Sequence, residues 1–343
     1  MNLLLITLLS FVFNHASAQV ALPKRAPTPK DNPESKAKIL LGKTLYFEPR
    51  LSVDGTISCN SCHNLMAGGE DQRSVSVGVA GQKGGRSAPT VWNAAFHTTQ
   101  FWDGRAASLE EQAVGPITNP IEMGMPSYQE VTNRLSSIPG YIPLFKNAFG
   151  KKAGITKENI GKAIAAFERT LLTPNSPFDR YKKGNKNALS KSAKNGLKLF
   201  QEKGCVSCHS GDNFSGSGVA MGSGFFQKFP VFEEENPYVD KYGLKLDGGR
   251  FEVTKNEADR GFWRVPSLRN IALTAPYFHN GSVKSLDEAV RVMAKSQLHL
   301  DLGPSQVNDL VSFLKSLTGV FPKIEMPRLP PTEAGLSLGV NVN

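Results

Sequence analysis

The sequence predicts a mainly α-helical protein made of two similar domains. Its 343 residues are enough for two domains of ordinary size, and 40% hydrophobic with 20% charged residues is typical of a globular protein. The motif Cys-x-x-Cys-His occurs twice, and similar helical patterns surround each copy. Length and repeat together favour two copies of one small helical module.

The chain begins with a stretch that resembles a secretion signal. Residues 3–13 form an apolar run too short to span a bilayer comfortably, and an Ala-Ser-Ala site precedes Gln19. The residues before this run include no Lys or Arg, so an uncleaved lipid-facing anchor is the alternative. We therefore expect a signal peptide over residues 1–18, a periplasmic mature protein, and no membrane span.

The formal net charge of +10 does not predict nucleic-acid binding. Lys and Arg are scattered along the chain, and aromatic residues are not interleaved with them. A basic surface of this kind is more typical of a solvated face that steers an acidic partner.

The cysteines predict the cofactor. All four belong to the motifs "CNSCH" and "CVSCH": Cys59, Cys62, Cys205 and Cys208. Disulfides are common in exported proteins, but Cys-x-x-Cys-His is the pattern that attaches a c-type haem through two thioethers, with the histidine as proximal iron ligand. A zinc site with four thiolates, or two redox dithiols, would leave His63 and His209 unexplained. We expect two covalent haems, each in a cytochrome c-like domain.

Helices are expected on both sides of each motif. Gly42, Leu45 and Tyr46 precede the first motif, and Gly196, Leu199 and Phe200 precede the second at the same spacing. Because glycine is a poor helix former, its presence on these faces predicts close helix crossings. The partner helices are expected downstream, where apolar residues recur with a period of 3.6: Ile160, Ile164, Phe167 and Leu171, then Val307, Leu310, Val311, Leu314 and Leu317.

The domain boundaries follow from composition. Residues 173–190 contain Pro, Asn, Gly and a run of charges, which predicts a linker. The first haem domain then covers residues 19–172 and the second residues 191–322. The Pro-rich segment 323–343 is expected to be an extended arm.

The remaining iron ligands are less determined. Met293 lies in a helical pattern, where a methionine usually belongs to the hydrophobic core. The alternative is that Met293 is the sixth iron ligand, because the haem of the second domain needs a ligand downstream of its motif and His/Met ligation suits electron transfer. The first half has no comparable residue apart from His97, so its iron is expected to be open to peroxide. Taken alone, His97, His279 and His299 are each more typical of structural residues.

Several further motifs carry a family resemblance. They are "FWDGRA" (101–106), "LEEQAVGP" (109–116), "NPIEMG" (119–124), "TLLTPNSPFDRY" (170–181) and "VPSLRNIALTAPYFHNGS" (265–282). With the two haem motifs, they make residues 33–319 resemble the bacterial di-haem cytochrome c peroxidases. The resemblance implies reduction of hydrogen peroxide by a homodimer, with electrons from a small donor such as a cytochrome c or cupredoxin.

The resemblance also implies roles for individual residues. It places a low-potential peroxidatic haem on Cys59, Cys62 and His63, and a high-potential electron-transfer haem on Cys205, Cys208 and His209 with Met293 as sixth ligand. Trp102 would lie between the haems, Glu122 would transfer the proton of peroxide, and Gln112 would orient peroxide. A calcium ion would bind the backbone oxygens of Thr274 and Pro276. Ser87 stands where the family has a third ligand, an asparagine.

One position departs from the family. Aligned through Ala88, Val79 stands where the family usually has a distal histidine that blocks the peroxidatic iron until the second haem is reduced. Valine cannot ligate iron, so we expect activity without reductive activation. The methylamine-utilisation di-haem enzyme also lacks this histidine and oxidises a protein substrate, but it has tyrosine at the position of Met293. A non-enzymatic electron carrier is the third alternative, and it would need both irons six-coordinate.

Overall fold

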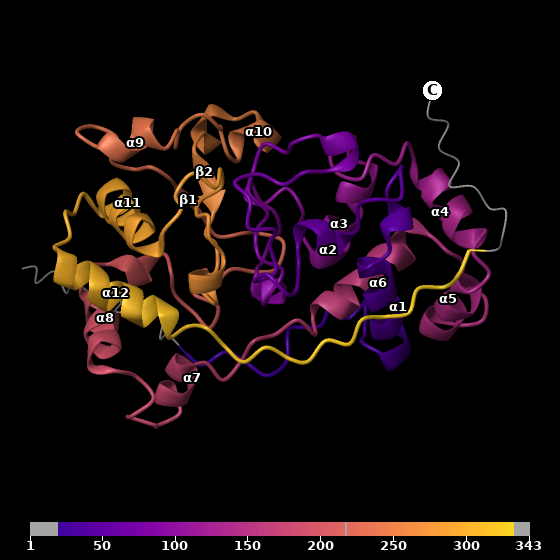
Figure 1. Cartoon of the computed structure of the whole chain (residues 1–343), viewed down its shortest axis with the longest axis horizontal. Helices are drawn as coiled ribbons and strands as arrows, with labels where there is room; N and C mark the ends of the chain where they lie inside the picture. Colours follow the sequence, from indigo (N-terminus) through magenta and orange to yellow (C-terminus); the bar gives the residue numbers. More distant parts are fainter. Residues whose placement is uncertain (1–19, 217, 333–343) are drawn as a thin grey trace, which may run out of the picture.

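The computed structural model describes residues 20–216 and 218–332, and these residues are mainly helical (Figure 1). The α-helices are α1 (Lys36–Tyr46), α2 (Cys59–Cys62), α3 (Leu109–Val114), α4 (Tyr128–Ser136), α5 (Tyr141–Phe149), α6 (Lys157–Glu168), α7 (Pro177–Lys182), α8 (Lys191–Glu202), α9 (Pro237–Lys241), α10 (Phe251–Thr254), α11 (Leu286–Leu298) and α12 (Pro304–Lys315). Two short strands, β1 (Phe226–Lys228) and β2 (Phe262–Arg264), pair antiparallel.

Short 3-10 helices connect these elements: η1 (Pro49–Leu51), η2 (Val79–Gly81), η3 (Ala94–Phe96), η4 (Pro116–Thr118), η5 (Cys205–Ser207), η6 (Glu257–Asp259) and η7 (Ile271–Leu273). Figure 1 shows α1 to α6 at one end of the molecule and α8, α11 and α12 at the other. We call these the N-terminal half (residues 20–172) and the C-terminal half (residues 173–318). No helix in the part of the chain that the structure describes is long and apolar enough to cross a membrane.

Each half contains a close crossing of two helices at a glycine. A Cβ placed on Gly42 of α1 would lie 1.8 Å from the carbonyl oxygen of Ala163 in α6. A Cβ placed on Gly196 of α8 would lie 1.9 Å from the carbonyl oxygen of Asp309 in α12. Since nonbonded heavy atoms cannot approach so closely, only glycine permits these crossings. The predicted close packing is confirmed in both halves.

The predicted apolar stripes form the cores. Ile160, Ile164, Phe167 and Leu171 are buried in the N-terminal core, together with Leu45 and Tyr46. Leu310, Leu314 and Leu317 are buried in the C-terminal core beside Phe200, and Val307 is also buried. Val311 is half-buried.

The predicted linker holds more structure than its composition suggests. Within residues 173–190, the helix α7 begins after Ser176, whose hydroxyl accepts a hydrogen bond from the Asp179 amide. Phe178 is fully buried in the C-terminal core, and its amide donates to the carbonyl oxygen of Ser316 at 3.1 Å. Asp179 forms a fully buried ion pair with Arg269 at 2.7 Å. These contacts attach α7 to the C-terminal half.

Both ends of the described chain cross between the halves. Near the N-terminus, the Leu22 amide donates to Asp179 in the C-terminal half at 3.0 Å, and a few residues later Pro27 accepts from Arg169 in the N-terminal half at 3.3 Å. After α12, residues 319–332 run as an extended segment along the N-terminal half (Figure 1), where the Pro330 carbonyl accepts from Arg50 at 2.8 Å. The predicted signal peptide lies outside the described residues, as do positions 333–343 of the predicted arm.

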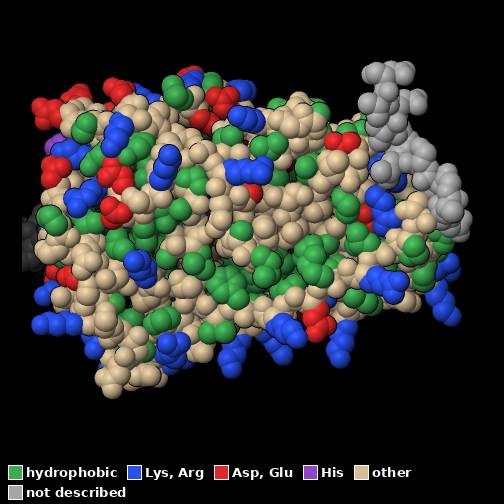
Figure 2. Space-filling view, viewed as in Figure 1, with side chains coloured by type: hydrophobic (Ala, Val, Ile, Leu, Met, Phe, Trp, Pro, Cys, Tyr) green, Lys and Arg blue, Asp and Glu red, His purple; other side chains and the backbone are tan. Residues whose placement is uncertain are grey.

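The charged side chains show no single basic patch on the face in view. Figure 2 shows Lys and Arg spread over this face, several of them along its lower edge, while Asp and Glu gather near α9. The distribution agrees with the scatter of basic residues along the sequence.

Candidate functional site

The first Cys-x-x-Cys-His motif forms a single helical turn, α2. The His63 amide donates to the carbonyl oxygen of Cys59 at 2.9 Å, which closes the turn. His63 Nδ1 lies 2.9 Å from the carbonyl oxygen of Pro89, so Nδ1 carries the hydrogen and Nε2 is left with its lone pair. Burial lowers the pKa of His63, which keeps the ring neutral. A neutral imidazole with an oriented ring is the form that ligates iron.

The second motif repeats this geometry in the C-terminal half. The His209 amide donates to the carbonyl oxygen of Cys205 at 3.0 Å, and His209 Nδ1 lies 3.0 Å from the carbonyl oxygen of Phe214. Burial lowers the pKa of His209 as well. The four cysteines are free and half-buried, and within residues 20–216 and 218–332 no three Cys, His, Asp or Glu side chains converge on a metal-sized site. The cysteines therefore do not meet in one four-thiolate centre, and each motif fits a covalently held haem.

Trp102 and Met293 contact one apolar cluster whose buried members all belong to the C-terminal half. The buried members of this cluster include Trp263, Tyr277 and Val292, and both Trp102 and Met293 pack against it while half-buried. Trp102 Nε1 donates to the carbonyl oxygen of Ser87 at 2.8 Å, and its own carbonyl accepts from the Arg264 amide at 2.9 Å. The indole is thereby fixed between residues of the N-terminal and C-terminal halves.

Glu122 precedes Met123, which belongs to the apolar core against which Cys59 of the first motif packs. Burial is the main cause that raises the pKa of the Cys62 thiol, and the charges of Asp71 and Glu122 add to this shift. Asn119 Nδ2 donates to Glu122 Oε1 at 3.1 Å, which orients the carboxyl group. Burial raises the pKa of Glu122 above the ordinary value, and the charge of Arg105 partly opposes this shift. A half-buried, oriented carboxyl group of this kind can accept and return a proton.

Gln112 lies in α3, the element that leads to the Glu122 loop. It is half-buried, and its backbone carbonyl accepts from the Gly115 amide at 3.0 Å at the end of the helix. The chain continues through η4 into residues 119–124, and the Met123 amide donates back to the Pro116 carbonyl at 3.3 Å. The structure therefore places Gln112 and Glu122 on consecutive elements of one compact segment.

Val79 lies against the loop that carries Glu122. The Val79 amide donates to the carbonyl oxygen of Glu122 at 3.0 Å, and the Val79 side chain is only 4% exposed. It packs so closely on Gly124 that a Cβ there would lie 2.9 Å from Val79 Cγ2. The departure noted in the sequence is thus next to the predicted proton-transfer group.

The predicted calcium ligands lie near the contact between the halves. The Ser87 amide donates to the carbonyl oxygen of His279 at 2.8 Å, and the Ser87 carbonyl accepts from Trp102, so the hydroxyl is the group left for a ligand role. Thr274 and Pro276 follow η7 and are half-buried.

A further carboxylate, Glu70, was missed by the sequence reasoning. It is 2% exposed, and within the described residues its Oε1 has no hydrogen-bond partner. Burial raises the pKa of Glu70 to about 7, and the charge of Glu70 in turn helps to raise the pKa of Tyr277, the neighbour of Pro276. The acidic pair after the glycines of "MAGGED" was the signal available in the sequence.

His97 is engaged by the C-terminal half. Its Nδ1 lies 2.7 Å from Arg264 Nη1, and because arginine stays protonated the guanidinium is the donor. Burial lowers the pKa of His97 well below the usual value. His279 stacks on Trp263 with ring centroids 4.0 Å apart, and His299 is exposed at the end of α11.

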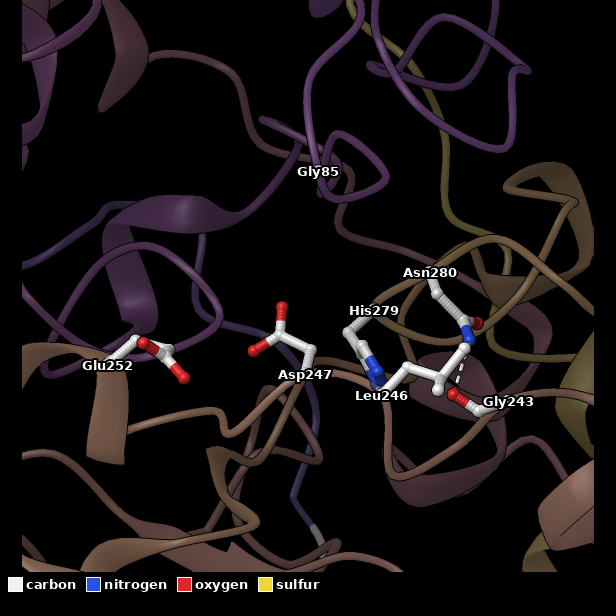
Figure 3. Close-up of a pocket in the computed structure, with 7 residues that line it drawn as sticks. All are labelled: Gly85, Gly243, Leu246, Asp247, Glu252, His279 and Asn280. Atoms are coloured by element: carbon white, nitrogen blue, oxygen red, sulfur yellow. Dashed lines mark hydrogen bonds between the residues drawn. The ribbon is translucent and has the colours of Figure 1, made fainter.

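A cluster of ion pairs around Arg86 was also missed. Arg86 Nε and Nη2 donate to Asp247 at 2.7 and 2.8 Å, and Nη1 donates to Asp103. Beside this cluster is a cavity of about 430 Å³ whose lining includes Gly85, Asp247 and His279 (Figure 3). Nothing in the local sequence shows that Asp247, 161 positions away, would meet Arg86.

Comparisons with known proteins agree with this arrangement. The family model described as di-haem cytochrome c peroxidase matches residues 36–187. A cytochrome c551 peroxidase of Nitrosomonas europaea is 44% identical over 325 residues, covering 94% of this chain and 92% of that protein. One of Pseudomonas aeruginosa is 45% identical over 311 residues, covering 90% and 86%. The solved structure of a MauG-like protein associated with microbial copper homeostasis is similar with a TM-score of 0.76 and 30% identity, covering 87% of this chain and 95% of that one.

Proposed function

Because the chain belongs to the di-haem cytochrome c peroxidase family, we propose that it is a periplasmic enzyme that reduces hydrogen peroxide to water with electrons from a small donor, a cytochrome c or a cupredoxin. The observation that carries the proposal is the position of Glu122, an oriented carboxyl group next to Met123 of the apolar core against which Cys59 of the first motif packs. The homodimer implied by the resemblance stays a prediction.

Each half would hold one haem. Cys59 and Cys62 would form the thioethers of the first, with His63 Nε2 toward its iron. In the C-terminal half the same roles fall to Cys205, Cys208 and His209, with Met293 as the sixth ligand. When bound, the first haem supplies an iron at which peroxide is reduced, and the second relays electrons to it.

Residues of the chain would then transfer the proton of hydrogen peroxide. Glu122 must be ionised to take the proton from one oxygen of peroxide, and it returns the proton to the oxygen that leaves as water. The bond from Asn119 holds Oε1, and Oε2 would carry the proton in this transfer. Gln112 would orient peroxide by hydrogen bonding. Trp102, fixed between the halves, would lie on the path of the electrons.

The first iron is proposed to be open in the diferric enzyme, because Val79 offers no ligating atom. We expect the EPR spectrum of the diferric enzyme as isolated to show a high-spin signal from the first haem beside a low-spin His/Met signal from the second. Two low-spin signals would contradict this proposal. The Val79→His variant should turn the first signal low-spin and abolish the reaction of the diferric enzyme with peroxide, whereas Val79→Ala should change neither.

Oxidation of a protein substrate is the second candidate, favoured by the likeness to the MauG-like structure. Met293 speaks against it, because the resemblance gives the methylamine-utilisation enzyme a tyrosine at that position. Stopped-flow mixing of the diferric enzyme with peroxide separates the two functions. Rapid turnover with small donors supports the peroxidase, while a persistent oxidised state without turnover supports the alternative.

A calcium ion would bind where the two halves meet. Thr274 and Pro276 would supply backbone oxygens. The buried Glu70, whose Oε1 has no hydrogen-bond partner among the described residues, would supply a carboxylate oxygen, a stronger calcium ligand than the Ser87 hydroxyl at the position of the family's asparagine. We expect calcium to raise the melting temperature of the enzyme above that in chelator, because an ion that binds the folded state stabilises it. Glu70→Gln should abolish this rise and Ser87→Ala should leave most of it. If Ser87→Ala abolished the rise and Glu70→Gln left most of it, Glu70 would be excluded as a calcium ligand.

A further inference from the structure

Residues 76–90, here called the gate loop, begin with a compact hairpin over residues 76–84. The Gly78 amide donates to the Gln82 carbonyl at 2.8 Å, and the Gly84 amide donates to the Ser76 carbonyl at 2.9 Å. A β-bridge between Val77 and Lys83 joins the two arms. These bonds are internal to the loop and connect residues 76–84 to one another.

The tip of the gate loop is attached to the loop that carries Glu122. In addition to the bond from the Val79 amide to the Glu122 carbonyl, Gln82 Nε2 donates to the Pro120 carbonyl at 3.0 Å. A Cβ on Gly78 would lie 2.0 Å from the Ile121 carbonyl oxygen, so the two loops lie flat against each other. The backbone of Glu122 is therefore held by the gate loop.

The other end of the gate loop is attached to the C-terminal half through Arg86. Its guanidinium makes a two-bonded pair with Asp247 and lies 5.0 Å from the ring centroid of Trp263. Bidentate pairs of this type fix geometry more strongly than single ion pairs. Figure 3 shows Asp247, which precedes α10, and Gly85 of the gate loop at the same cavity.

Asp103 completes the attachment on the N-terminal side. Its carboxylate is buried and accepts a hydrogen bond from Arg86 Nη1. It also accepts from Arg105 Nη1, which lies 2.9 Å from Oδ2 and 3.1 Å from Oδ1. Loss of Arg86 would leave Asp247 without its two-bonded partner and Asp103 with one cation in place of two. Truncating one partner of a buried ion pair costs more than the pair itself contributes.

We propose that Arg86 is a positioning residue for Glu122. By tying the gate loop to Asp103 and to Asp247, it keeps the hairpin against residues 119–124 and so holds the proton-transfer group in place. In this chain, ion pairs and backbone bonds hold the loop where Val79 offers no bond to iron. The inference rests on the proposed peroxidase function for its kinetic part, but its structural part stands without it.

Hydrogen exchange in the haem-loaded enzyme tests the structural part. In Arg86→Gln, we expect amide exchange of the peptide covering residues 77–84 to be at least tenfold faster than in the wild type. Arg86→Lys keeps the charge but loses the planar guanidinium that makes two hydrogen bonds, so its exchange rate should lie between those of the wild type and Arg86→Gln. The matched control is Arg260→Gln, which removes an arginine that likewise pairs with a carboxylate, Glu257, and stacks on a ring, Phe251, outside the gate loop. It should leave this peptide unchanged.

Stopped-flow kinetics tests the functional part. The second-order rate constant of the diferric enzyme with peroxide should fall at least tenfold in Arg86→Gln, because small displacements of a catalytic group cost large factors in rate. The acidic limb of the pH–rate profile, which reports Glu122, should shift in Arg86→Gln and not in the control. Asp247→Asn, which weakens one attachment only, should give a smaller change in the same direction.

The outcomes separate the two proposals. Wild-type exchange of residues 77–84 in Arg86→Gln would overturn the positioning role, and so would a wild-type rate constant with an unchanged pH profile. If the wild type reacts with peroxide neither in the diferric state nor with the second haem reduced, while Arg86→Gln still loosens the loop, the peroxidase function fails and the attachment stands. If Arg86→Gln does not fold, the Lys and Asn variants decide, and wild-type exchange in both would overturn the inference.

Discussion

Replacement of Glu122 by glutamine is expected to lower peroxide turnover by about two to four orders of magnitude, the usual contribution of a positioned acid–base group. Glutamine keeps the shape of the side chain and can still accept the bond from Asn119 Nδ2. It cannot take up and return a proton at neutral pH. The measurement is steady-state turnover with a reduced small donor, together with EPR to show that both haems are retained.

The pH dependence gives a second test of Glu122. Burial raises its pKa, so the carboxyl group stays protonated to a higher pH than an exposed glutamate does. The active form is the ionised one, and turnover should therefore fall as pH drops through this raised pKa. The limb should be absent in Glu122→Gln and unchanged in Glu130→Gln, an exposed glutamate of α4. A wild-type rate in Glu122→Gln would transfer the proton role to another group.

Replacement of Gly42 by alanine is expected to destabilise the enzyme by about 3 kcal/mol, at the upper end of the usual cost of overpacking. The added methyl group would meet the Ala163 carbonyl at 1.8 Å, and this neighbour is backbone rather than a flexible side chain. The helices α1 and α6 would have to move apart, which opens the packing around Leu45 and Phe167. The higher helix propensity of alanine offsets only about 1 kcal/mol of this cost.

Thermal unfolding of the haem-loaded enzyme measures the effect, which should lower the melting temperature by about 10 °C for a domain of this size. Gly196→Ala should have a similar effect, since its methyl group would meet the Asp309 carbonyl at 1.9 Å. Gly154→Ala is the matched control because the nearest atom to its Cβ is Thr156 Cγ2 at 3.8 Å, an ordinary contact. Equal melting temperatures for the three variants would show that the crossings tolerate a side chain.

Local patterns made the helical framework predictable. Gly42 and Gly196 each begin the same Gly-x-x-Leu-aromatic pattern before the two motifs, and the 3.6-residue period marks their partners α6 and α12. The same patterns could not reveal that residues 173–190 contain α7, because the breakers and charges around Phe178 resemble a solvated linker. Burial of Phe178 comes from contacts with Phe214 and Phe313, which lie far away in the sequence.

The site was predictable where a motif carries its own chemistry. Each Cys-x-x-Cys-His motif predicts by itself the two thiols and the histidine that would hold a haem. Glu122 and Trp102 were predicted only from longer segments that resemble the peroxidase family. Arg86 could not be identified at all, because its partners Asp103 and Asp247 come from segments that only the tertiary fold brings together. Glu70 was missed because its burial depends on the tertiary fold and not on its local sequence.

The crossing chain ends give the molecule an interlocked character. Residues 20–27, at the start of the N-terminal half, contact Asp179 and Arg269 of the C-terminal half. Residues 319–332, which follow the C-terminal half, contact Lys43 and Arg50 of the N-terminal half. A protease cut in the exposed turn near Gly184 would leave α7 on the N-terminal fragment, where Asp179 still pairs with Arg269 of the other fragment. Residues 319–332 would still contact Lys43 and Arg50. We expect such a nicked enzyme to elute as one particle, which would show that non-covalent contacts, and not an unbroken chain, hold the two haem sites at a fixed separation.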